Sequence, residues 1–265
     1  MSTSHWDKLY GAWSRLRTPV RLQDEVIAAF AQQIADRPGP VLLLGLTRGL
    51  TDLRPDVVAI DRDETSVRDR WPGDATTRRA VVGDWRQPPF AAGAFAACIG
   101  DGIPNALQHP DGAASLYDAL AALLSPGGRL VCRVFAMPDV PETVDAVGAA
   151  ALQGQIRRFM AFKFRLAMAV CAERGDPNIA VQAIHDAFEA AFPDRNRLAA
   201  AGGWDRAEVD TIDVYRSSPQ VYSFPTRQQC LSVIPAAFTD ARFVAVGTFE
   251  LAERYPLLVM ERSSY

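Results

Sequence analysis

Hydrophobic positions along the chain follow two spacings, one typical of helices and one typical of buried strands. Residues 4–17 and 24–35 carry apolar side chains three and four positions apart, which predicts two N-terminal helices. Later apolar runs lack polar alternation, as expected of parallel strands covered by helices on both faces. These predicted strands begin at Val41, Val57, Val81, Phe95 and Arg129.

The C-terminal part of the chain, after the fifth predicted strand, contains a long inserted segment and two further predicted strands. Residues 242–250 and 256–262 are predicted to form two strands joined by a short turn. Between the fifth strand and this pair, residues 137–241 exceed the single connecting helix that a minimal α/β domain needs. Within them we expect two long helical segments over residues 144–172 and 177–192. A hairpin is expected over residues 209–224, and a shorter helix over residues 226–234.

A glycine turn and an acid mark the first two strands. Gly45 and Gly49 follow the first strand, where open α/β sheets bind ligands and where a missing side chain lets backbone approach the ligand. Asp61 ends the second strand and is placed to accept hydrogen bonds from both hydroxyls of a ribose. This combination predicts a nucleoside site.

The segment after Gly49 indicates which nucleoside. A dinucleotide needs its pyrophosphate at the N-terminus of a full helix. Only Leu50 to Asp56 separate Gly49 from the next strand, and Pro55 shortens the usable helix further. S-adenosylmethionine carries no phosphate and can dispense with that helix. The spacing therefore favours S-adenosylmethionine over NAD.

Three further segments follow in order: residues 81–90 with a Gly-Asp strand end, residues 95–102 with an acid at the strand tip, and residues 123–135 with a Pro-Gly-Gly turn. Over roughly residues 38–137 the chain resembles the class I S-adenosylmethionine-dependent methyltransferases. The resemblance implies a Rossmann-like, seven-stranded, mostly parallel sheet with helices on both faces and an antiparallel last strand. We expect N-terminal helices over 1–37, a cofactor-binding domain over 38–137 and 225–265, and a helical and hairpin cap over 138–224.

The resemblance also implies roles for individual positions. The turn from Gly45 through Leu46 and Thr47 to Gly49 corresponds to the one that wraps the cofactor's methionine part. Asp61, beside Arg62, corresponds to the ribose acid. The adenine is expected at Gly83, Asp84 and Trp85, and the methionyl amine and transferred methyl at Gly100, Asp101 and Gly102.

Two positions depart from the family pattern. Leu43 stands where the family usually has an acid, and Thr47 stands where it has a third glycine. Asp101 could supply the missing charge. A protein that binds S-adenosylmethionine or S-adenosylhomocysteine without transferring a methyl group is therefore one alternative, and an NAD-dependent oxidoreductase is another.

Candidate side chains for the chemistry are few. Asp101, then Tyr10, then His185 could accept a proton from a methyl acceptor, although Asp101 is equally explained as a helix cap. Tyr10 belongs to an aromatic stripe that is more often core. Arg21 or Arg48 could bind the cofactor's carboxylate. The basic group at Arg157, Arg158, Lys163 and Arg165 could attract an acidic substrate, but the wet face of a helix is the better interpretation.

Composition narrows the partners. A net charge of −3 gives no basic footprint for nucleic acid, and no apolar run is long enough to span a membrane. We expect a cytoplasmic enzyme, monomeric or homodimeric, that acts on a small-molecule methyl acceptor. The spacing of histidines and cysteines predicts no metal site, and buried thiols are expected at Cys98, Cys132, Cys171 and Cys230.

Overall fold

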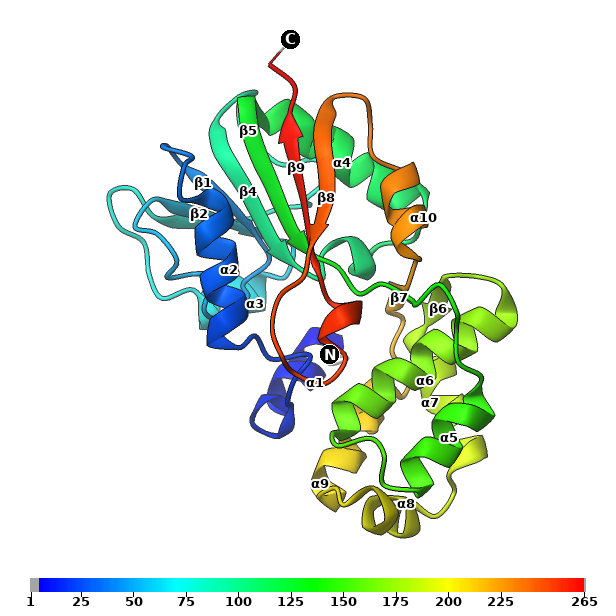
Figure 1. The fold of residues 1–265 in the computed structure, drawn as a ribbon. Coiled ribbons are helices and arrows are strands. Elements are labelled where there is room, and N and C mark those ends of the chain that lie inside the picture. Colours follow the sequence, from blue (N-terminus) through cyan, green and yellow to red (C-terminus); the bar gives the residue numbers. More distant parts are fainter. Residues whose placement is uncertain (1–4, 265) are drawn as a thin grey trace. The chain divides into compact units, whose positions relative to one another are not determined.

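The apolar runs form the strands of one mixed sheet in the computed structural model, which describes residues 5–264 (Figure 1). The strand order is β3-β2-β1-β4-β5-β9-β8. Neighbours among β1 to β5 pair in parallel, whereas β9 is antiparallel to both β5 and β8. The bounds are β1 Val41–Leu44, β2 Val57–Asp61, β3 Arg79–Val82, β4 Phe95–Asp101, β5 Leu124–Arg133, β8 Phe238–Val244 and β9 Leu257–Arg262. The predicted fold class is confirmed.

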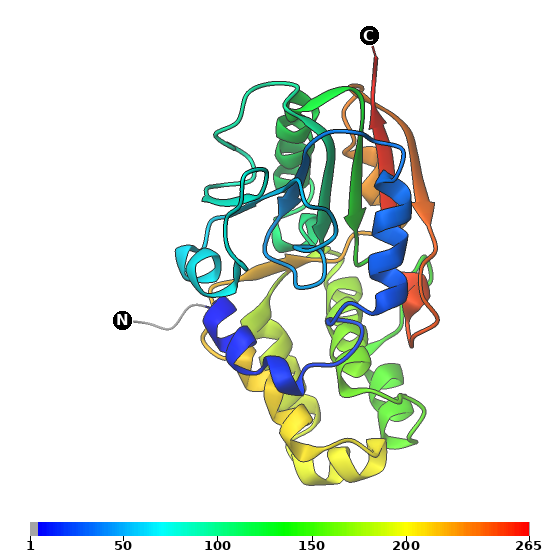
Figure 2. The ribbon, with the colours of Figure 1, turned by 90° about the vertical axis from the view of Figure 1, so that its left-hand side faces the viewer.

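Helices cover both faces of this sheet, as Figure 2 shows, with α2 (Asp24–Ile34) on one face and α4 (Asp111–Leu123) on the other. Alternate strand residues, among them Leu42, Leu44 and Cys98, pack with α4 in one continuous apolar core. The other helical elements here are α3 Glu64–Arg70, η2 Pro104–Ala106, α10 Arg227–Ser232 and η4 Ala252–Arg254. Because successive strand side chains point to opposite faces, the unbroken apolar runs are what a sheet covered on both sides requires.

The chain forms two compact units. The sheet unit comprises Leu22–Ala136, Gln228–Gly247 and residues 253–264, and the helical unit comprises residues 5–21, Met137–Arg227 and Thr248–Ala252. These limits differ from the predicted domains in that α2 groups with the sheet and residues 5–21 group with the inserted segment.

The helical unit is built from short helices and a small two-stranded sheet. Its elements are α1 His5–Gly11, η1 Trp13–Arg15, α5 Val144–Leu152, α6 Phe159–Arg174, β6 Asn178–Ala180, α7 Val181–Ala191, α8 Arg195–Gly202, α9 Arg206–Val209, η3 Asp210–Tyr215 and β7 Val221–Ser223. Its core gathers five aromatic rings in mutual contact, namely Phe159, Phe162, Phe188, Phe192 and Trp204.

Several predicted elements are corrected here. The hairpin over residues 209–224 is wrong, because residues 210–215 form a 3-10 helix and β7 pairs instead with β6. The single helix over 144–172 is two helices, since Gly154 adopts a φ of 66° and breaks the run. The predicted strand over 242–250 is displaced to β8, because Gly247, at a φ of 82°, turns the chain away. The first predicted helix ends at Gly11, and its start at Ser4 lies outside the described residues.

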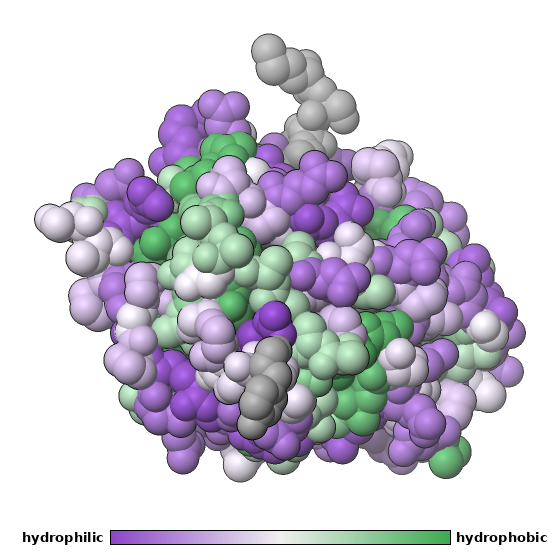
Figure 3. Space-filling model, turned by 90° about the horizontal axis from the view of Figure 1, so that it is seen from above, coloured by the Kyte–Doolittle hydropathy of each residue, from purple (hydrophilic) through white to green (hydrophobic). Residues whose placement is uncertain are grey.

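The surface mixes hydrophilic and hydrophobic areas on the face seen from above in Figure 3. Large hydrophobic side chains that stand well exposed in the described chain are Val82, Val140, Leu152 and Leu231. Within residues 5–264, each helix is too short or too polar to cross a bilayer.

Candidate cofactor site

The carboxyl ends of β1 and β2 meet at Gly45 and Asp61. The Gly45 N–H donates to the Ile60 carbonyl at 2.9 Å, and the Gly83 N–H donates to the Asp61 carbonyl at 2.9 Å, so the loops leave the sheet side by side. A Cβ placed on Gly45 would lie 3.8 Å from Asp61 Oδ2. The glycine turn and the acid predicted from the sequence are therefore neighbours at the edge where α/β sheets bind ligands.

The two carboxylate oxygens of Asp61 differ in their hydrogen bonding. Its Oδ1 accepts the Asp63 N–H at 3.0 Å, whereas Oδ2 has no hydrogen-bond partner among residues 5–264. Burial raises the pKa of this carboxyl, and the Asp63 N–H partly opposes the shift. A half-buried acceptor at a strand end suits a neutral hydroxyl donor.

The glycine turn is tight and ends without a helix. Gly45 and Gly49 adopt φ values of 75° and 93°, and a Cβ on Gly49 would meet Ile27 Cδ1 at 2.5 Å. Leu46 is buried and Thr47 half-buried between them. The described segment from Leu50 to Asp56 contains turns and irregular backbone but no helix, so no helix N-terminus is offered to a pyrophosphate here.

Leu43 forms part of the sheet core. It is 0% exposed in β1 and pairs with Ala59 and Ile99 in the two flanking strands. An acid at this position would be buried between those strands, so the departure from the family pattern completes the apolar face.

Asp84 and Trp85 each make a contact that the sequence did not reveal. Both Asp84 oxygens accept from the Arg86 guanidinium, at 3.1 and 2.8 Å, and these hydrogen bonds lower the pKa of the carboxyl. Trp85 is 8% exposed, and its indole N–H donates to the Ile60 carbonyl at 2.9 Å. Its ring lies 3.8 Å from the Cβ position of Gly45 and forms one wall of the glycine turn. Arg62 is exposed.

Asp101 is tied to an arginine. It ends β4 opposite Arg133 of β5, whose Nε donates to Oδ1 at 2.6 Å and whose Nη2 donates to Oδ2 at 3.1 Å. Burial raises the pKa of Asp101, and the Arg133 charge opposes this shift. Both carboxylate oxygens accept from the guanidinium, so a methyl acceptor would have to compete with Arg133 for them. Gly100 and Gly102 flank it at the strand end.

Tyr10 and Arg21 belong to the helical unit. The Tyr10 ring packs against Trp13 with a centroid distance of 5.4 Å, and Arg21 is exposed. Their assignment to the cofactor or acceptor stays a prediction.

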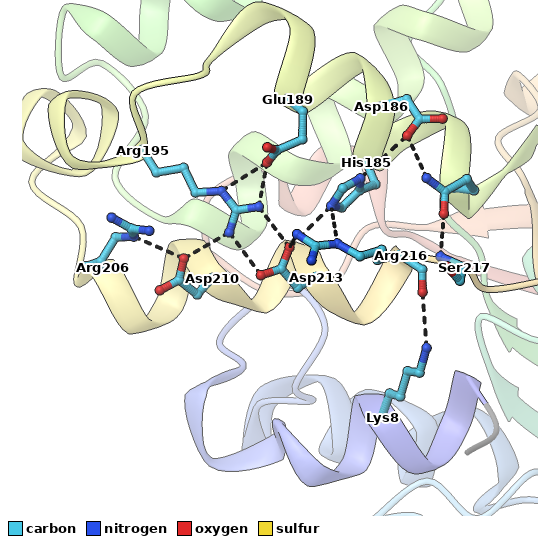
Figure 4. Close-up of polar contacts among 11 residues, drawn as sticks. Lys8, His185, Asp186, Glu189, Arg195, Arg206, Asp210, Asp213, Arg216 and Ser217 are labelled. Atoms are coloured by element: carbon cyan, nitrogen blue, oxygen red, sulfur yellow. Dashed lines mark hydrogen bonds and ion pairs between the residues drawn. The ribbon is translucent and has the colours of Figure 1, made fainter. Parts of the chain in front are cut away.

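His185 takes part in an ion-pair network of the helical unit (Figure 4). Its Nε2 lies 3.2 Å from Asp213 Oδ1 and 3.4 Å from Arg216 Nε. Arg195 also pairs with Asp213, at 2.8 Å, and its hydrogen bonds are the main reason that the pKa of Asp213 falls to about 2. These contacts join α7, α8 and η3, and they account for His185 without catalysis.

One residue of the basic group that was predicted to lie on the wet face of a helix, Lys163, is buried instead. Lys163 is 1% exposed and so does not belong to a wet helix face. Its Nζ lies 4.5 Å from the centroid of the Tyr215 ring and has no hydrogen bond among residues 5–264. Burial lowers its pKa to about 7. Helical spacing could not reveal this, because α6 is buried on nearly all sides.

The four cysteines are buried thiols, as predicted. In the described part of the chain, His, Cys, Asp and Glu form no group of three or more able to hold a metal ion.

Known structures share this fold at low sequence identity. A putative Zn-dependent alcohol dehydrogenase from Rhodobacter sphaeroides has a TM-score of 0.55 and 15% identity, covering 99% of this chain and 99% of its own. The S-adenosylmethionine-dependent methyltransferase SibL has a TM-score of 0.52 and 15% identity, covering 97% of this chain and 59% of its own. An S-adenosylmethionine-dependent methyltransferase from Methanosarcina mazei has a TM-score of 0.50 and 10% identity, covering 92% and 100%.

No protein-family model matches the chain, and no curated protein matches it. The structural likeness and the strand order together show the α/β Rossmann-like fold of class I methyltransferases.

Proposed function

We propose that the chain binds S-adenosylmethionine at the carboxyl ends of β1, β2 and β4 and transfers its methyl group to a small-molecule acceptor. The observation that carries this proposal is that Gly45 lies next to Asp61, whose Oδ2 has no hydrogen-bond partner among residues 5–264, and that no helix follows the glycine turn in residues 50–56. A ribose needs the acid, and a cofactor without phosphate does not need the helix.

The residues of the sheet unit fit this cofactor in stated roles. Asp61 accepts from the ribose hydroxyls, the turn from Gly45 to Gly49 holds the methionine part, and the loop at Asp84 and Trp85 meets the adenine. The bound cofactor supplies an electrophilic methyl group, and the chain contributes by holding the acceptor in line and excluding water. With Asp101 paired to Arg133, an acceptor that reacts without losing a proton to this carboxylate is favoured.

Binding without methyl transfer is the second candidate function. It is favoured by the same Asp101 pairing and by Leu43, which removes a charge near the cofactor's ammonium group. An NAD-dependent oxidoreductase is less favoured, because residues 50–56 provide turns where a pyrophosphate needs a helix.

The proposal also covers the class of acceptor, the location and the oligomeric state. A net charge of −3 supports a small molecule rather than a nucleic acid as acceptor. A cytoplasmic location and a monomeric or homodimeric state belong to the same proposal.

Thermal unfolding with ligands tests the cofactor. A ligand at a hundred times its Kd adds about 2.7 kcal/mol, which raises the Tm of a chain of this size by several degrees. We expect a rise with S-adenosylmethionine and S-adenosylhomocysteine but not with NAD. A rise with NAD alone would overturn the proposal, and turnover of S-adenosylmethionine with an acceptor would separate transfer from binding alone.

Asp61→Ala tests the ribose contact. We expect calorimetry to show an affinity for S-adenosylhomocysteine lower by about tenfold or more, because a charged hydrogen-bond acceptor is lost. Asp69→Ala is the matched control, since Asp69 is exposed and pairs with its neighbour Arg68. Equal affinities in the two variants would remove Asp61 from the site.

A further inference from the structure

Arg133 is a buried cation at the carboxyl edge of the sheet. It is 0% exposed at the end of β5, directly opposite Asp101 in the β4 register. The ion pair joins Nε and Nη2 of the guanidinium to the two carboxylate oxygens. One side of the planar fork is therefore satisfied within the sheet unit.

The other side of the guanidinium is not satisfied. Arg133 Nη1 is buried and has no hydrogen-bond partner among residues 5–264. Two aromatic rings lie near the group, with Cζ 5.4 Å from the Phe135 centroid and 5.8 Å from the Tyr255 centroid. An aromatic ring is at most a weak acceptor and does not replace an oxygen as the partner of a guanidinium N–H. Leaving a buried donor unsatisfied costs about 1–3 kcal/mol, which an ion pair made only for stability would not require.

Neighbouring backbone fixes this arginine in place. The Gly102 N–H donates to the Arg133 carbonyl at 2.9 Å. Asn105 holds the next turn: its Nδ2 donates to the Phe135 carbonyl, and its Oδ1 accepts the Phe135 N–H, both at 2.9 Å. A Cβ on Gly102 would lie 3.0 Å from the Phe135 ring, so the loop after β4 and the end of β5 are closely packed. The unsatisfied donors are thus held on rigid elements.

We propose that Arg133 receives a carboxylate of a bound ligand through Nη1. This proposal rests on the proposed function, because it places a ligand at the edge of β4 and β5. A guanidinium can bind two carboxylates, one along Nε and Nη2 and a second along Nη1 and Nη2. Asp101 fills the first position, and the ligand fills the second.

A carboxylate fits better than other ligand groups. The free N–H groups are donors only, and their planar geometry matches two oxygens of one carboxylate. The Asp101–Arg133 pair is neutral as a whole, so one added negative charge is bound by directed hydrogen bonds rather than by excess positive charge. Because Nη1 is buried, we expect the rings of Phe135 and Tyr255 to move when the ligand enters. The carboxylate belongs either to the cofactor's methionine part or to the acceptor.

Arg133→Lys is the variant for the test, since it keeps a positive charge beside Asp101 and loses the fork. Asp101→Asn/Arg133→Gln is the second variant, and it removes both charges together if the lysine form does not fold. Calorimetry compares S-adenosylhomocysteine with its decarboxylated analogue. If the cofactor is the source, the native chain binds S-adenosylhomocysteine at least tenfold more tightly than the analogue, and this ratio collapses in the variants.

A second arm uses benzoate as the probe, titrated into the native chain and the variants with and without S-adenosylhomocysteine and followed by NMR. If the acceptor is the source, the cofactor ratio is unchanged, and benzoate binds the native chain but binds the variants at least tenfold more weakly. The proposal is overturned if neither the ratio nor benzoate binding depends on Arg133. Failure of the native chain to bind S-adenosylhomocysteine would sink the proposed function, and the benzoate arm would still decide the role of Arg133.

Discussion

The two units differ in how they treat buried charge. In the sheet unit, the buried Arg133 pairs with Asp101, and Arg129 pairs with Asp36 and Glu261. In the helical unit, Lys163 is just as buried but has no ion pair or hydrogen bond among residues 5–264. Paired strands bring chain segments into fixed register, which places Arg133 opposite Asp101 of β4 and Arg129 opposite Glu261 of β9. Short helices have no such register, and in the helical unit the half-buried Arg195 pairs with Glu189, Asp210 and Asp213 while the fully buried Lys163 is left unpaired among residues 5–264.

The helical unit compensates in another way. Nearby groups move toward neutrality: burial and the Lys163 charge lower the pKa of His5 to about 4, and burial raises the pKa of Glu208. Neutral His5 bonds Tyr222 at 2.8 Å and Ser218 at 2.9 Å. The buried polar groups around Lys163 are therefore stabilised by staying uncharged, whereas Arg133 and Arg129 of the sheet unit are stabilised by pairing.

The largest expected effect tests whether the units are energetically separate. Phe162→Ala, in the aromatic core of the helical unit, should lower the free energy of unfolding by about 3–5 kcal/mol. Phe30→Ala in α2 is the matched change in the sheet unit, since both side chains are 0% exposed. Unfolding in urea, followed by hydrogen exchange, should show each change destabilising mainly its own unit. Equal loss of protection in both units would contradict the separation.

Breaking the charge pair of the sheet unit comes next. Asp101→Asn leaves Arg133 buried without its counter-ion and should cost about 3–5 kcal/mol. Asp101→Asn/Arg133→Met removes both charges and should recover much of that loss. Unfolding in urea measures both. If the double variant is no more stable than Asp101→Asn alone, the loss does not come from an uncompensated charge on Arg133.

Lys163→Met should act in the opposite direction. Folded chain binds the Lys163 proton only below about pH 7, whereas unfolded chain binds it up to the usual pKa of 10.5. Unfolded chain therefore holds more protons between these pH values, so Lys163 lowers stability most at pH 7 and below, and least near pH 10. We expect the variant to be more stable by on the order of a few kcal/mol at pH 7. A stability difference that stays constant from pH 7 to pH 10 would mean that Lys163 stays charged.

Helix caps should give the smallest effects. Asp63 caps α3 of the sheet unit, accepting from the Thr65 N–H at 3.1 Å and from Ser66 Oγ at 2.7 Å. Thr143 caps α5 of the helical unit with one bond, from the Ala146 N–H at 3.1 Å. Each alanine substitution should cost about 1 kcal/mol. Asp63→Ala should lower the stability more than Thr143→Ala, because Asp63 also accepts from Ser66 Oγ. A larger loss for Thr143→Ala in thermal unfolding would show that the Ser66 hydrogen bond does not contribute.

The sheet could be predicted from the sequence because its signals are local. Apolar runs such as Val41–Leu44 and residues 257–260 are buried on both faces, and glycine or proline marks most of their ends. The meeting of Gly45 and Asp61 followed from strand order alone. Their roles toward a cofactor, and those of the other predicted site residues, stay predictions.

The other contacts of the candidate site could not be predicted, because they join residues that are far apart in the sequence. Nothing local distinguishes Asp101 as a proton acceptor from Asp101 as the partner of Arg133, which is distant in sequence. The arginine that directly follows the apolar residues 130–132 of β5 was the available signal for that pair. Residues 209–224 were mistaken for a hairpin because Ile212 and Val214 alternate with polar residues. The buried Val209, Ile212 and Tyr215 are three apart, which is the period of the 3-10 helix that forms. In it Asp210 and Asp213 pair with Arg195.

The two ends of the inserted segment lie side by side. The Met137 N–H donates to the Pro225 carbonyl at 3.0 Å, and Met137 and Thr226 form a parallel bridge. A segment whose ends meet can lengthen, shorten or be exchanged while its attachment points keep their spacing, and the closure entropy changes only slowly with length. The chain is thus modular at this joint, and one contiguous exchange between Met137 and Thr226 would replace most of the helical unit without altering the order of the strands.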